Sequence, residues 1–518
     1  MSLALRQDLR RLVGEEALVP ESEHAAFAED VYAQGALPAA VLRPRTREKL
    51  PALIEYAAER GIGVIVRGGG LSYTDAYLCR EGSFVLLDFS GLDRILEIAE
   101  ANGFVRVECG LSWAALAQAL AARGLRTPYW GPLSGREATI GGALSQNSVF
   151  LGSASYGAVG ESVLSITLLD GCGRLFATGA AAAGALPFFR HFGPDFTGCF
   201  LGDAGTLGIK LEASLRVIRA PSGLAFLSFQ FRAAETFLAA LAELARARLC
   251  AELFGFDPVL AEIRLRRARL REQLSTAGKV LKRQGLAAFL RLARAGRGFL
   301  DPSCYSLHAV IEGESPAIAR EKQRLARALL RQCGGEEVEA SIPRVLRSDP
   351  FPPPNVILGP GGERWVPVHG ILPHERAQAA WCALAELLAA EAAACRAHGV
   401  KVGFLFAAAG PEGSLIEPCF YWPGEWQAFH RRRVEPEVLA RLPQPKPDPE
   451  ADALVARLRR HLADRLRAQG AAHFQLGRFY RWRGELDPTS RALYEALKRE
   501  LDPKGILNPG ALPEEPPC

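Results

Sequence analysis

The order of apolar and polar positions in the first half of the chain predicts helices and strands in alternation. Apolar residues recur three and four positions apart over 50–58, as on one face of a helix, with Thr46 and Gly61 placed to cap its two ends. A further helix is expected from a cap at Ser112 to a stop at Gly124. Runs rich in β-branched and aromatic residues predict strands at 64–66, 84–87, 104–108, 162–169 and 175–177. This pattern is typical of a mixed α and β domain.

After about residue 220 the pattern changes, because glycines become sparse and long stretches of Ala, Leu and Arg have helical spacing. A second domain is therefore expected to begin there. Prolines cluster at 349–362 and again at 443–449, where an extended, stiff linker is predicted. A helix over 451–469 and a final helix, capped by Asp487 with Pro488 in its first turn, follow.

Composition narrows the class of protein. The 518 residues hold 62 Lys and Arg against 57 Asp and Glu, a formal charge of +5, and 49% of them are apolar. These values exclude disordered, collagen-like and disulfide-scaffold proteins and a polybasic nucleic-acid binder. The cysteines form no CxxC pair, and the chain shows no signal-peptide stretch and no uninterrupted apolar span of about 20 residues. A cytoplasmic location is therefore expected.

The segment 261–300 is a charge anomaly, with eleven Arg and Lys against only Glu262 and Glu272. Three interpretations stay open: a solvated helical face, which the pattern favours, a patch that touches anionic lipid and, as the weakest, a nucleic-acid contact. Leu286 and Phe289 beside Arg291 suggest the lipid contact, and with it a peripheral association with a membrane.

Three glycine-rich segments carry the candidate ligand chemistry. Backbone amides without side chains can approach and cradle an anionic pyrophosphate. The first segment follows a predicted strand but matches neither GxGxxG nor the P-loop, so by itself it also fits a plain tight turn. The candidate residues are Arg67, Gly68, Gly69, Gly70, Leu71 and Ser72 in the first segment, Thr139, Gly141, Gly142, Ser145 and Asn147 in the second, and Gly205, Thr206, Gly208 and Ile209 in the third.

In this order the segments resemble the FAD domain of the vanillyl-alcohol oxidase and p-cresol methylhydroxylase family, which carries an RGGGHS-like loop, a TIGG segment and a GxxGxLGI segment. Residues 502–510 resemble the family's C-terminal DPxGIxNPG stretch. The resemblance implies FAD as cofactor and an α+β fold, with a two-subdomain FAD-binding domain of the p-cresol methylhydroxylase type and an α+β cap domain with an antiparallel sheet. The implied parts are an N-terminal helical segment 1–37, the FAD-binding domain 38–220, a cap domain 221–470 that contains the proline-rich linker, and a C-terminal segment 471–518 that completes the active site.

Two departures from the family's pattern bear on the chemistry. Leu71 stands where many relatives have the histidine that bonds the flavin, so dissociable FAD is predicted, unless a cap-domain residue provides a different bond. The HxxGDGNxH-like metal segment of relatives that oxidise D-2-hydroxy acids is missing, so no metal is expected. Residues 403–422 take its place, and their aromatic side chains suggest either an apolar pocket or a cap-domain core. The resemblance also adds Pro132, Ser134 and Asn508 to the flavin-binding candidates.

The resemblance further indicates candidate catalytic residues. His369 ends a stretch similar to the family's WFxP segment beside the flavin, with a histidine simply bonded at a strand end as the alternative. His473 stands where phenol-oxidising relatives keep a Tyr-Arg pair, which disfavours a phenol substrate and makes this histidine a candidate base. Arg478 is a candidate cation for a carboxylate or a reduced flavin, and Arg478 or Tyr480 is expected to position a polar group of the substrate.

These features predict an FAD-dependent oxidoreductase that takes a hydride from a small alcohol or 2-hydroxy acid, either aliphatic or aromatic. The electron acceptor is open among a quinone, an electron-transfer protein and oxygen, with a dehydrogenase favoured. Two alternatives are a non-redox flavoenzyme of the alkylglycerone-phosphate synthase type and a flavin-binding protein without turnover. No nucleic-acid partner is expected, and a homodimer is left open.

Overall fold

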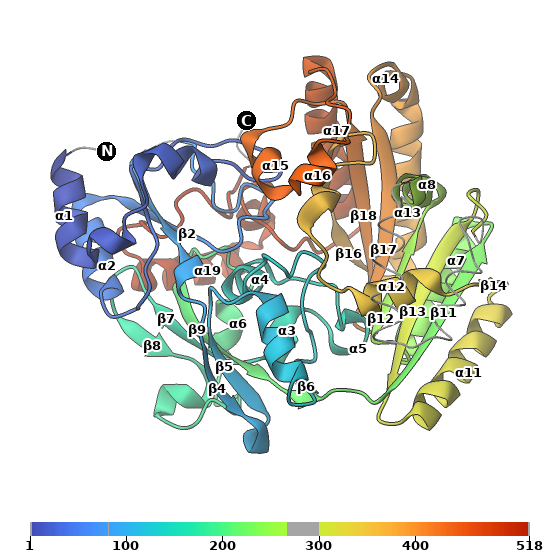
Figure 1. The fold of residues 1–518 in the computed structure, drawn as a ribbon, viewed down its shortest axis with the longest axis horizontal. Coiled ribbons are helices and arrows are strands. Elements are labelled where there is room, and N and C mark those ends of the chain that lie inside the picture. The colour runs from blue at the N-terminus through green and yellow to red at the C-terminus, as the bar shows by residue number, and fades with distance from the viewer. Residues whose placement is uncertain (1–2, 81, 267–299, 516–518) are drawn as a thin grey trace. The chain divides into compact units, whose positions relative to one another are not determined.

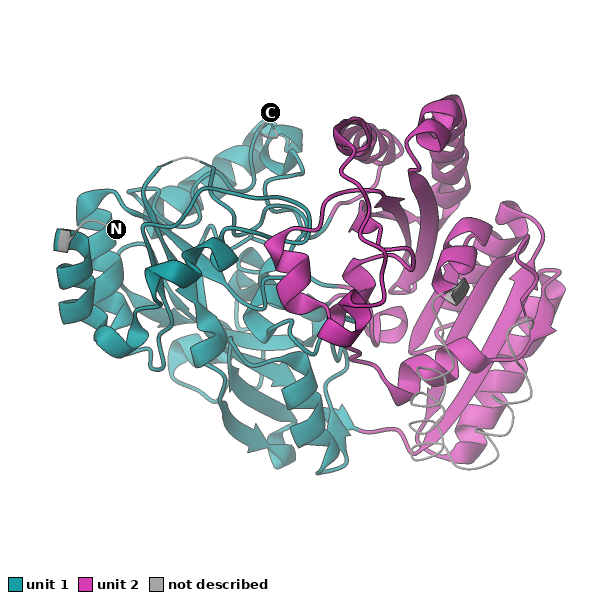
Figure 2. Cartoon of the chain, turned by 45° about the horizontal axis from the view of Figure 1, so that its top comes forward, with its two compact units in different colours: residues 1–148, 159–219, 474–518 teal, residues 149–158, 220–473 magenta. Residues whose placement is uncertain are grey.

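A computed structural model describes residues 3–80, 82–266 and 300–515 of the chain. Its backbone forms two compact units, unit 1 of residues 1–148, 159–219 and 474–518 and unit 2 of residues 149–158 and 220–473 (Figure 2). The short segment 149–158, which the sequence places inside the first domain, is part of unit 2. Most of the basic segment 261–300, and with it the expected lipid contact, lies outside the described residues.

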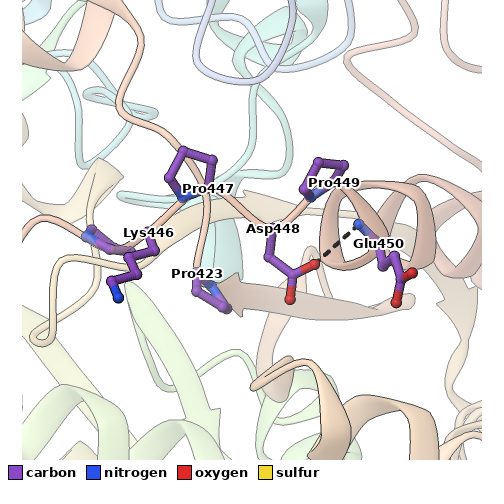
Figure 3. A pocket seen from close by; sticks show the side chains of 7 residues that line it. Pro423, Lys446, Pro447, Asp448, Pro449 and Glu450 are labelled. Atoms are coloured by element: carbon purple, nitrogen blue, oxygen red, sulfur yellow. Dashed lines mark hydrogen bonds between the residues drawn. The ribbon is translucent and has the colours of Figure 1, made fainter.

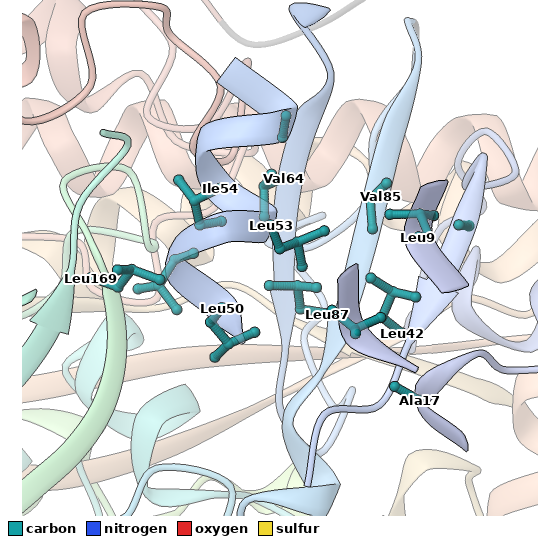
Figure 4. Close-up of a cluster of buried hydrophobic side chains, with 14 of the residues drawn as sticks. Leu9, Ala17, Leu42, Leu50, Leu53, Ile54, Val64, Val85, Leu87 and Leu169 are labelled. Carbon is teal, nitrogen blue, oxygen red and sulfur yellow. The ribbon is translucent and has the colours of Figure 1, made fainter. Parts of the chain in front are cut away.

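Unit 1 begins with three parallel strands in the order β1–β3–β2, accompanied by two helices (Figure 1). Leu9, Leu53, Val64 and Leu87 belong to one buried apolar cluster, which also contains Leu507 near the C-terminus (Figure 4). Burial of such side chains stabilises the fold by about 1.5–3 kcal/mol each. The elements are α1 (Leu3–Val13), β1 (Ala40–Leu42), α2 (Leu50–Arg60), β2 (Gly63–Arg67) and β3 (Phe84–Asp88).

The rest of unit 1 is built on a five-stranded antiparallel sheet in the order β4–β5–β9–β7–β8. All five strands predicted for this half of the chain are present. The elements are β4 (Ile95–Ala99), β5 (Phe104–Glu108), α3 (Trp113–Ala121), α4 (Ile140–Gln146), β7 (Val163–Leu169), β8 (Leu175–Ala177), α6 (Phe196–Cys199), β9 (Ile209–Arg216) and α19 (Pro488–Leu501), with the short pair β6 (Leu125–Arg126) and β10 (Ile218–Arg219) beside them.

The helix caps were predicted with mixed success. Ser112 caps α3 and Asp487 caps α19 through side-chain oxygens that accept backbone amide hydrogens, and Gly61 ends α2 with a φ of 61°. The prediction of Thr46 as a cap was wrong, because α2 starts later and Lys49 holds the cap position. A proline in the first turn of α2 has no amide hydrogen to cap, which makes a side-chain cap less necessary.

Unit 2 is built on an antiparallel sheet of eight strands in the order β14–β11–β13–β12–β17–β18–β15, with β16 also paired to β18. Neighbouring residues of β11 face opposite sides: Phe231 packs against Phe237 of α7, whereas Phe226 packs against Ala340, which precedes α12. The strands are β11 (Gly223–Phe231), β12 (Glu252–Phe256), β13 (Tyr305–Gly313), β14 (Glu336–Val338), β15 (Arg364–Pro367), β16 (Gly370–Pro373), β17 (Lys401–Ala409) and β18 (Gly413–Trp422).

Helices cover both faces of this sheet. The main ones are α5 (Ser153–Tyr156), α7 (Ala234–Arg246), α8 (Pro258–Arg266), α11 (Pro316–Gln332), α12 (Ser341–Ser348), α13 (His374–Ala390), α14 (Ala392–Ala397), α15 (Ala428–Arg433), α16 (Pro436–Leu439) and α17 (Pro449–Ala468). Among the described residues, no helix is both long and apolar enough to cross a membrane.

The proline-rich segment 443–449 runs between α16 and α17, inside unit 2. It lines a shallow surface depression together with Pro423 (Figure 3). Asp448 ends the segment by capping α17, since its carboxylate accepts the backbone amide hydrogens of Glu450 and Ala451, each at 3.0 Å. The segment therefore serves as the approach to a helix, and its lining residues offer no group suited to flavin chemistry.

A buried ion pair in unit 1 generates a test of stability. Lys210 Nζ lies 2.5 Å from Asp203 Oδ1, and both side chains are only 2% exposed. Removing one partner of a buried pair leaves the other charge without compensation. We therefore expect Lys210→Met to lower the free energy of unfolding by about 3–5 kcal/mol, as measured by urea denaturation of the full chain.

Two further variants separate the buried charge from lost packing. Asp203→Asn combined with Lys210→Met should recover most of the loss, because no charge then remains buried. Glu97→Gln, which breaks the exposed pair between Glu97 and Arg106, should change stability little. A double variant as unstable as Lys210→Met alone would contradict the electrostatic explanation.

Candidate flavin-binding site

The first glycine segment is shaped by close packing against the second. It leaves the end of β2, and a Cβ atom at Gly68 would come within 2.2 Å of Thr139 Oγ1. A Cβ atom at Gly69 would come within 2.1 Å of the carbonyl oxygen of Glu137, which is backbone and cannot swing away. Gly70 has a φ of 71°, in the left-handed region that favours glycine. The backbone path alone thus requires glycine at these three positions, whether or not a ligand is bound.

The second glycine segment starts α4. Thr139 caps this helix, and its Oγ1 accepts the amide hydrogen of Gly142 at 3.2 Å. The amide of Gly141 donates to the carbonyl oxygen of Cys109 at 2.8 Å. These two amides are therefore engaged within the protein, and the prediction that they cradle a phosphate has no direct support in their geometry.

The third glycine segment is joined to the end of α4. The amide of Gly202 donates to the carbonyl oxygen of Leu144, and the amide of Ala204 donates to that of Ser145, both at 2.9 Å. Thr206 is buried, and its Oγ1 donates to the carbonyl oxygen of Asp203 at 2.8 Å. The candidate residues Gly208 and Ile209 lead into β9 and are buried.

The C-terminal stretch returns to these segments through Asn508. The amide of this residue donates to Val64 in β2 at 2.9 Å, and its Nδ2 donates to the carbonyl oxygens of Ala76 and Ala204 at 2.9 and 2.6 Å. Arg478 donates to its Oδ1 at 2.7 Å. The side chain of Asn508 is thus fully used in joining the first segment, the third segment and the C-terminus.

Lys498 is a supporting residue that the sequence did not reveal. Its Nζ donates to the carbonyl oxygens of Thr206 and Leu507 at 2.7 and 3.0 Å and pairs with Asp502 Oδ2 at 2.6 Å. The spacing of four residues to Asp502 on the predicted last helix was the one signal available.

Burial divides the predicted flavin-binding residues into two sets. All of them lie in unit 1, so the fold gathers the three segments into one region. A flat, phosphorylated ligand reaches main-chain groups only where the backbone is not fully buried. The half-buried residues therefore fit contact with FAD better than the buried ones. The half-buried residues are Gly68, Gly69, Leu71, Ser72, Pro132, Ser134, Gly141, Gly142, Ser145, Asn147 and Gly205, and the buried ones are Arg67, Gly70, Thr139, Thr206, Gly208, Ile209 and Asn508.

Arg478 and Tyr480 also lie in unit 1. The guanidinium of Arg478 donates to the carbonyl oxygens of Asp75, Ala76 and Pro509 at 2.7–3.1 Å in addition to Asn508. Burial lowers the pKa of Arg478 to about 10, still well above neutral pH. These bonds tie the C-terminal segment to the loop after β2, and they occupy the guanidinium that the sequence assigned to a substrate.

His369 and His473 meet in unit 2. Nδ1 of His473 lies 2.7 Å from the carbonyl oxygen of His369, and adjoining backbone bonds between Ile371 and Ala472 fix the two segments side by side. Burial lowers the pKa of His473 to about 4, opposed by the carbonyl oxygens of His369 and Ala463. Burial, reinforced by the nearby His473, lowers the pKa of His369 to about 3. Both rings are therefore neutral at pH 7.

The aromatic stretch 403–422 forms the hairpin of β17 and β18. Phe404 and Phe406 pack edge-on against Trp381 of α13, with ring centroids 4.7 and 5.7 Å apart. These two rings belong to the core under that helix and do not line a pocket. Within the described ranges, no group of three or more His, Cys, Asp and Glu is placed to hold a metal ion.

Comparison with known proteins identifies similar FAD-binding proteins. Residues 38–179 match the family model described as FAD binding domain. The glycolate oxidase subunit GlcD of Bacillus subtilis is 30% identical over 185 residues, which are 36% of this chain and 38% of that protein. The mitochondrial D-lactate dehydrogenase [cytochrome] of Kluyveromyces lactis is 30% identical over 35% of this chain and 30% of its own length. The chain thus matches less than half the length of these relatives.

Solved structures match over a longer span. A 4-ethylphenol oxidase from Gulosibacter chungangensis has a TM-score of 0.69 at 16% identity and covers 100% of this chain and 98% of its own. An alkyldihydroxyacetonephosphate synthase has a TM-score of 0.69 at 15% identity over 98% of this chain and 85% of its own. These likenesses confirm the predicted fold, and the family match confirms FAD as the cofactor of the predicted binding domain.

The packing of Gly69 generates a test of the site. Gly69→Ala places a methyl group against the carbonyl oxygen of Glu137, so the first and second segments must move apart. We expect the purified variant to carry less than about a tenth of the FAD per chain found in the wild type, because the clash disturbs preorganised binding groups. FAD released into the supernatant by acid precipitation measures this content.

Gly124→Ala is the matched control. Gly124 has a φ of 68°, so the substitution costs backbone strain, but a Cβ atom there meets nothing within 4 Å. Its FAD content should equal that of the wild type. Flavin that stays in the wild-type pellet would mean a covalent bond and would refute the prediction from Leu71.

Proposed function

We propose that this chain is an FAD-dependent oxidoreductase that takes a hydride from a CH–OH group of a small alcohol or 2-hydroxy acid. The observation that carries the proposal is the FAD binding domain match over residues 38–179, which contain the first and second glycine segments. FAD supplies a two-electron acceptor, and the protein must bind it, orient the substrate and take up a proton.

The first glycine segment is the best candidate for contact with the FAD phosphates. Gly68 and Gly69 are half-buried and pack against Thr139 and Glu137, next to the start of α4. Leu71 has no nucleophilic atom, so the FAD is held without a bond at this loop. Ser72 shapes the loop, since its Oγ accepts the amide hydrogens of Thr74 and Ala76 at 3.1 and 3.2 Å.

His473 is the proposed proton acceptor. A carbonyl oxygen can only accept, so Nδ1 of the neutral His473 ring donates to His369, and the carbonyl oxygen of Ala463 is a second acceptor for this ring. A neutral imidazole with a fixed tautomer is suited to remove the hydroxyl proton as the hydride leaves. His369 then acts as a positioning residue through its backbone, because its own ring is fully buried.

The substrate class rests on the relatives. Proteins named glycolate oxidase subunit, D-lactate dehydrogenase and D-2-hydroxyglutarate dehydrogenase match this chain over 35–36% of its length. These names share the oxidation of a 2-hydroxy acid. The electron acceptor we propose is a quinone or an electron-transfer protein, which makes the enzyme a dehydrogenase.

A second candidate is a non-redox flavoenzyme. It is favoured by the likeness to the alkyldihydroxyacetonephosphate synthase over 98% of this chain. A fold shared at 15% identity does not fix the chemistry. The two candidates differ in whether a substrate reduces the flavin.

An anaerobic absorption spectrum tests the proposal. The FAD-loaded chain is mixed with a panel of 2-hydroxy acids and small aliphatic and aromatic alcohols, and bleaching of the flavin band is recorded. We expect one chemical class to bleach the flavin. Flavin that no compound reduces, in a protein that binds FAD fully, would favour the non-redox candidate, and a chain that takes up no FAD would refute both.

The role of His473 predicts the behaviour of one variant. His473→Ala should slow flavin reduction by about 100-fold or more with unchanged FAD content, since a positioned base contributes about 10²–10⁴-fold. His461→Ala, on the exposed side of α17, should leave the rate unchanged. Stopped-flow absorbance measures both rates.

The pH dependence follows from the lowered pKa of His473. Because its pKa is about 4, the ring is already deprotonated at pH 6, and the wild-type rate should be flat from pH 6 to pH 8. Below about pH 5 the rate should fall as the ring takes up a proton. A break near pH 6.5 in the wild-type profile would show that another group is the base.

A further inference from the structure

The surface of unit 1 exposes a loop of large apolar side chains between the 3-10 helix η6 (Gly179–Ala183) and α6. We call it the aromatic loop, residues 186–196. Across the described ranges, the four exposed phenylalanines all fall in its eleven positions. Its exposed apolar side chains are Leu186 at 56%, Phe188 at 55%, Phe189 at 49%, Phe192 at 60% and Phe196 at 57%.

The aromatic loop is held firmly by its backbone. The amide of Ala180 donates to the carbonyl oxygen of Phe189 at 2.9 Å. Arg190 donates through one guanidinium nitrogen to the carbonyl oxygen of Gly160 at 2.6 Å and pairs through the others with Asp195. The rings of Phe188 and Phe189 pack on each other at 6.1 Å between centroids. The phenylalanines are thus presented to solvent by an ordered scaffold, although burial would stabilise each of them.

Charge limits what this loop can bind. Arg190 and Asp195 pair at 2.8 Å and neutralise each other, and His191 is the other titratable residue among 186–196. A neutral surface has no long-range attraction for anionic lipid or for a charged protein. It also has no like charges to repel when the same surface of a second molecule faces it, as happens across a twofold axis.

The area is sufficient for a dimer. A fully buried aromatic side chain covers about 150–250 Å², so each half-exposed ring offers about 100 Å². Four phenylalanines and Leu186 then supply about 500 Å² on each molecule, or about 1,000 Å² for a pair, which reaches the lower bound of a specific interface.

We propose that the aromatic loop is the contact through which two copies of this chain form a twofold dimer. Each loop packs its phenylalanines against the same side chains of its partner, and the paired Arg190 and Asp195 stay at the rim. The proposal does not depend on the reaction that the flavin performs.

Sedimentation velocity of the FAD-loaded full chain tests this contact. We expect the wild type to be a dimer at 10 μM. The double variant Phe188→Ser, Phe192→Ser should be a monomer at that concentration. Its dimer dissociation constant should be raised at least about 100-fold, as when central aromatic contacts of an interface are removed. Phe188→Leu with Phe192→Leu retains apolar area and should still dimerise. Leu493→Ser removes an exposed apolar side chain on α19, 64% exposed, and should not change the assembly.

The remaining outcomes overturn the proposal. A wild type that is monomeric at 100 μM refutes it, as does a dimer that survives the two serine substitutions with unchanged FAD content. Flotation with vesicles of neutral phosphatidylcholine tests the competing explanation, which is contact with a membrane. A monomeric wild type that floats with the vesicles, while the serine variant does not, would assign the aromatic loop to a membrane surface instead.

Discussion

The architecture of unit 1 depends on the return of the C-terminus to β2, and Asn508 makes that return specific. Residues 506–508 bond to both backbone groups of Val64. The amide of Val64 donates to the carbonyl oxygen of Ile506, and the carbonyl oxygen of Val64 accepts from the amide of Asn508. The φ of Asn508 is 40°, a left-handed conformation that asparagine tolerates better than most residues. Its amide group then donates to the carbonyl oxygens of Ala76 and Ala204, the first of which also accepts from Arg478. One side chain therefore closes the chain on itself and sets the distance between the first and third glycine segments.

This closure explains why the site tolerates so few side chains. With β2 fixed from one side by the C-terminus, the loop after it has to pass directly over the turn that ends at Thr139. Gly68 and Gly69 are needed for that passage, because a carbonyl oxygen and a hydroxyl occupy the space of a Cβ atom. Chain packing alone thus demands glycine at these positions, and a substitution at either one disturbs the loop that we propose to contact FAD.

The sequence predicted the order of glycine segments, all five strands of the first half and the caps at Ser112 and Asp487, because each depends on local chemistry. It did not predict interactions between distant segments. Arg478 was assigned to a substrate on its position beside a motif, whereas its hydrogen bonds to carbonyl oxygens depend on where residues 75–76 and 509 lie. The aromatic loop was missed for the opposite reason: an apolar run has the composition of a core, and only the fold reveals that it faces solvent.

The two units differ in how strongly packing restricts which amino acid fits at a position. Close backbone approach in unit 1 leaves glycine as the one residue that fits at positions such as Gly69, and the FAD binding domain model matches residues 38–179, most of which lie in this unit. In unit 2 the positions between sheet and helices are filled by side chains, and volume-conserving exchanges there cost little. The fold can therefore persist at 15–16% identity while the residues facing a substrate change completely. Position 369 illustrates this freedom. The oxygen that bonds His473 Nδ1 belongs to the backbone of His369, so any residue at that position would provide it.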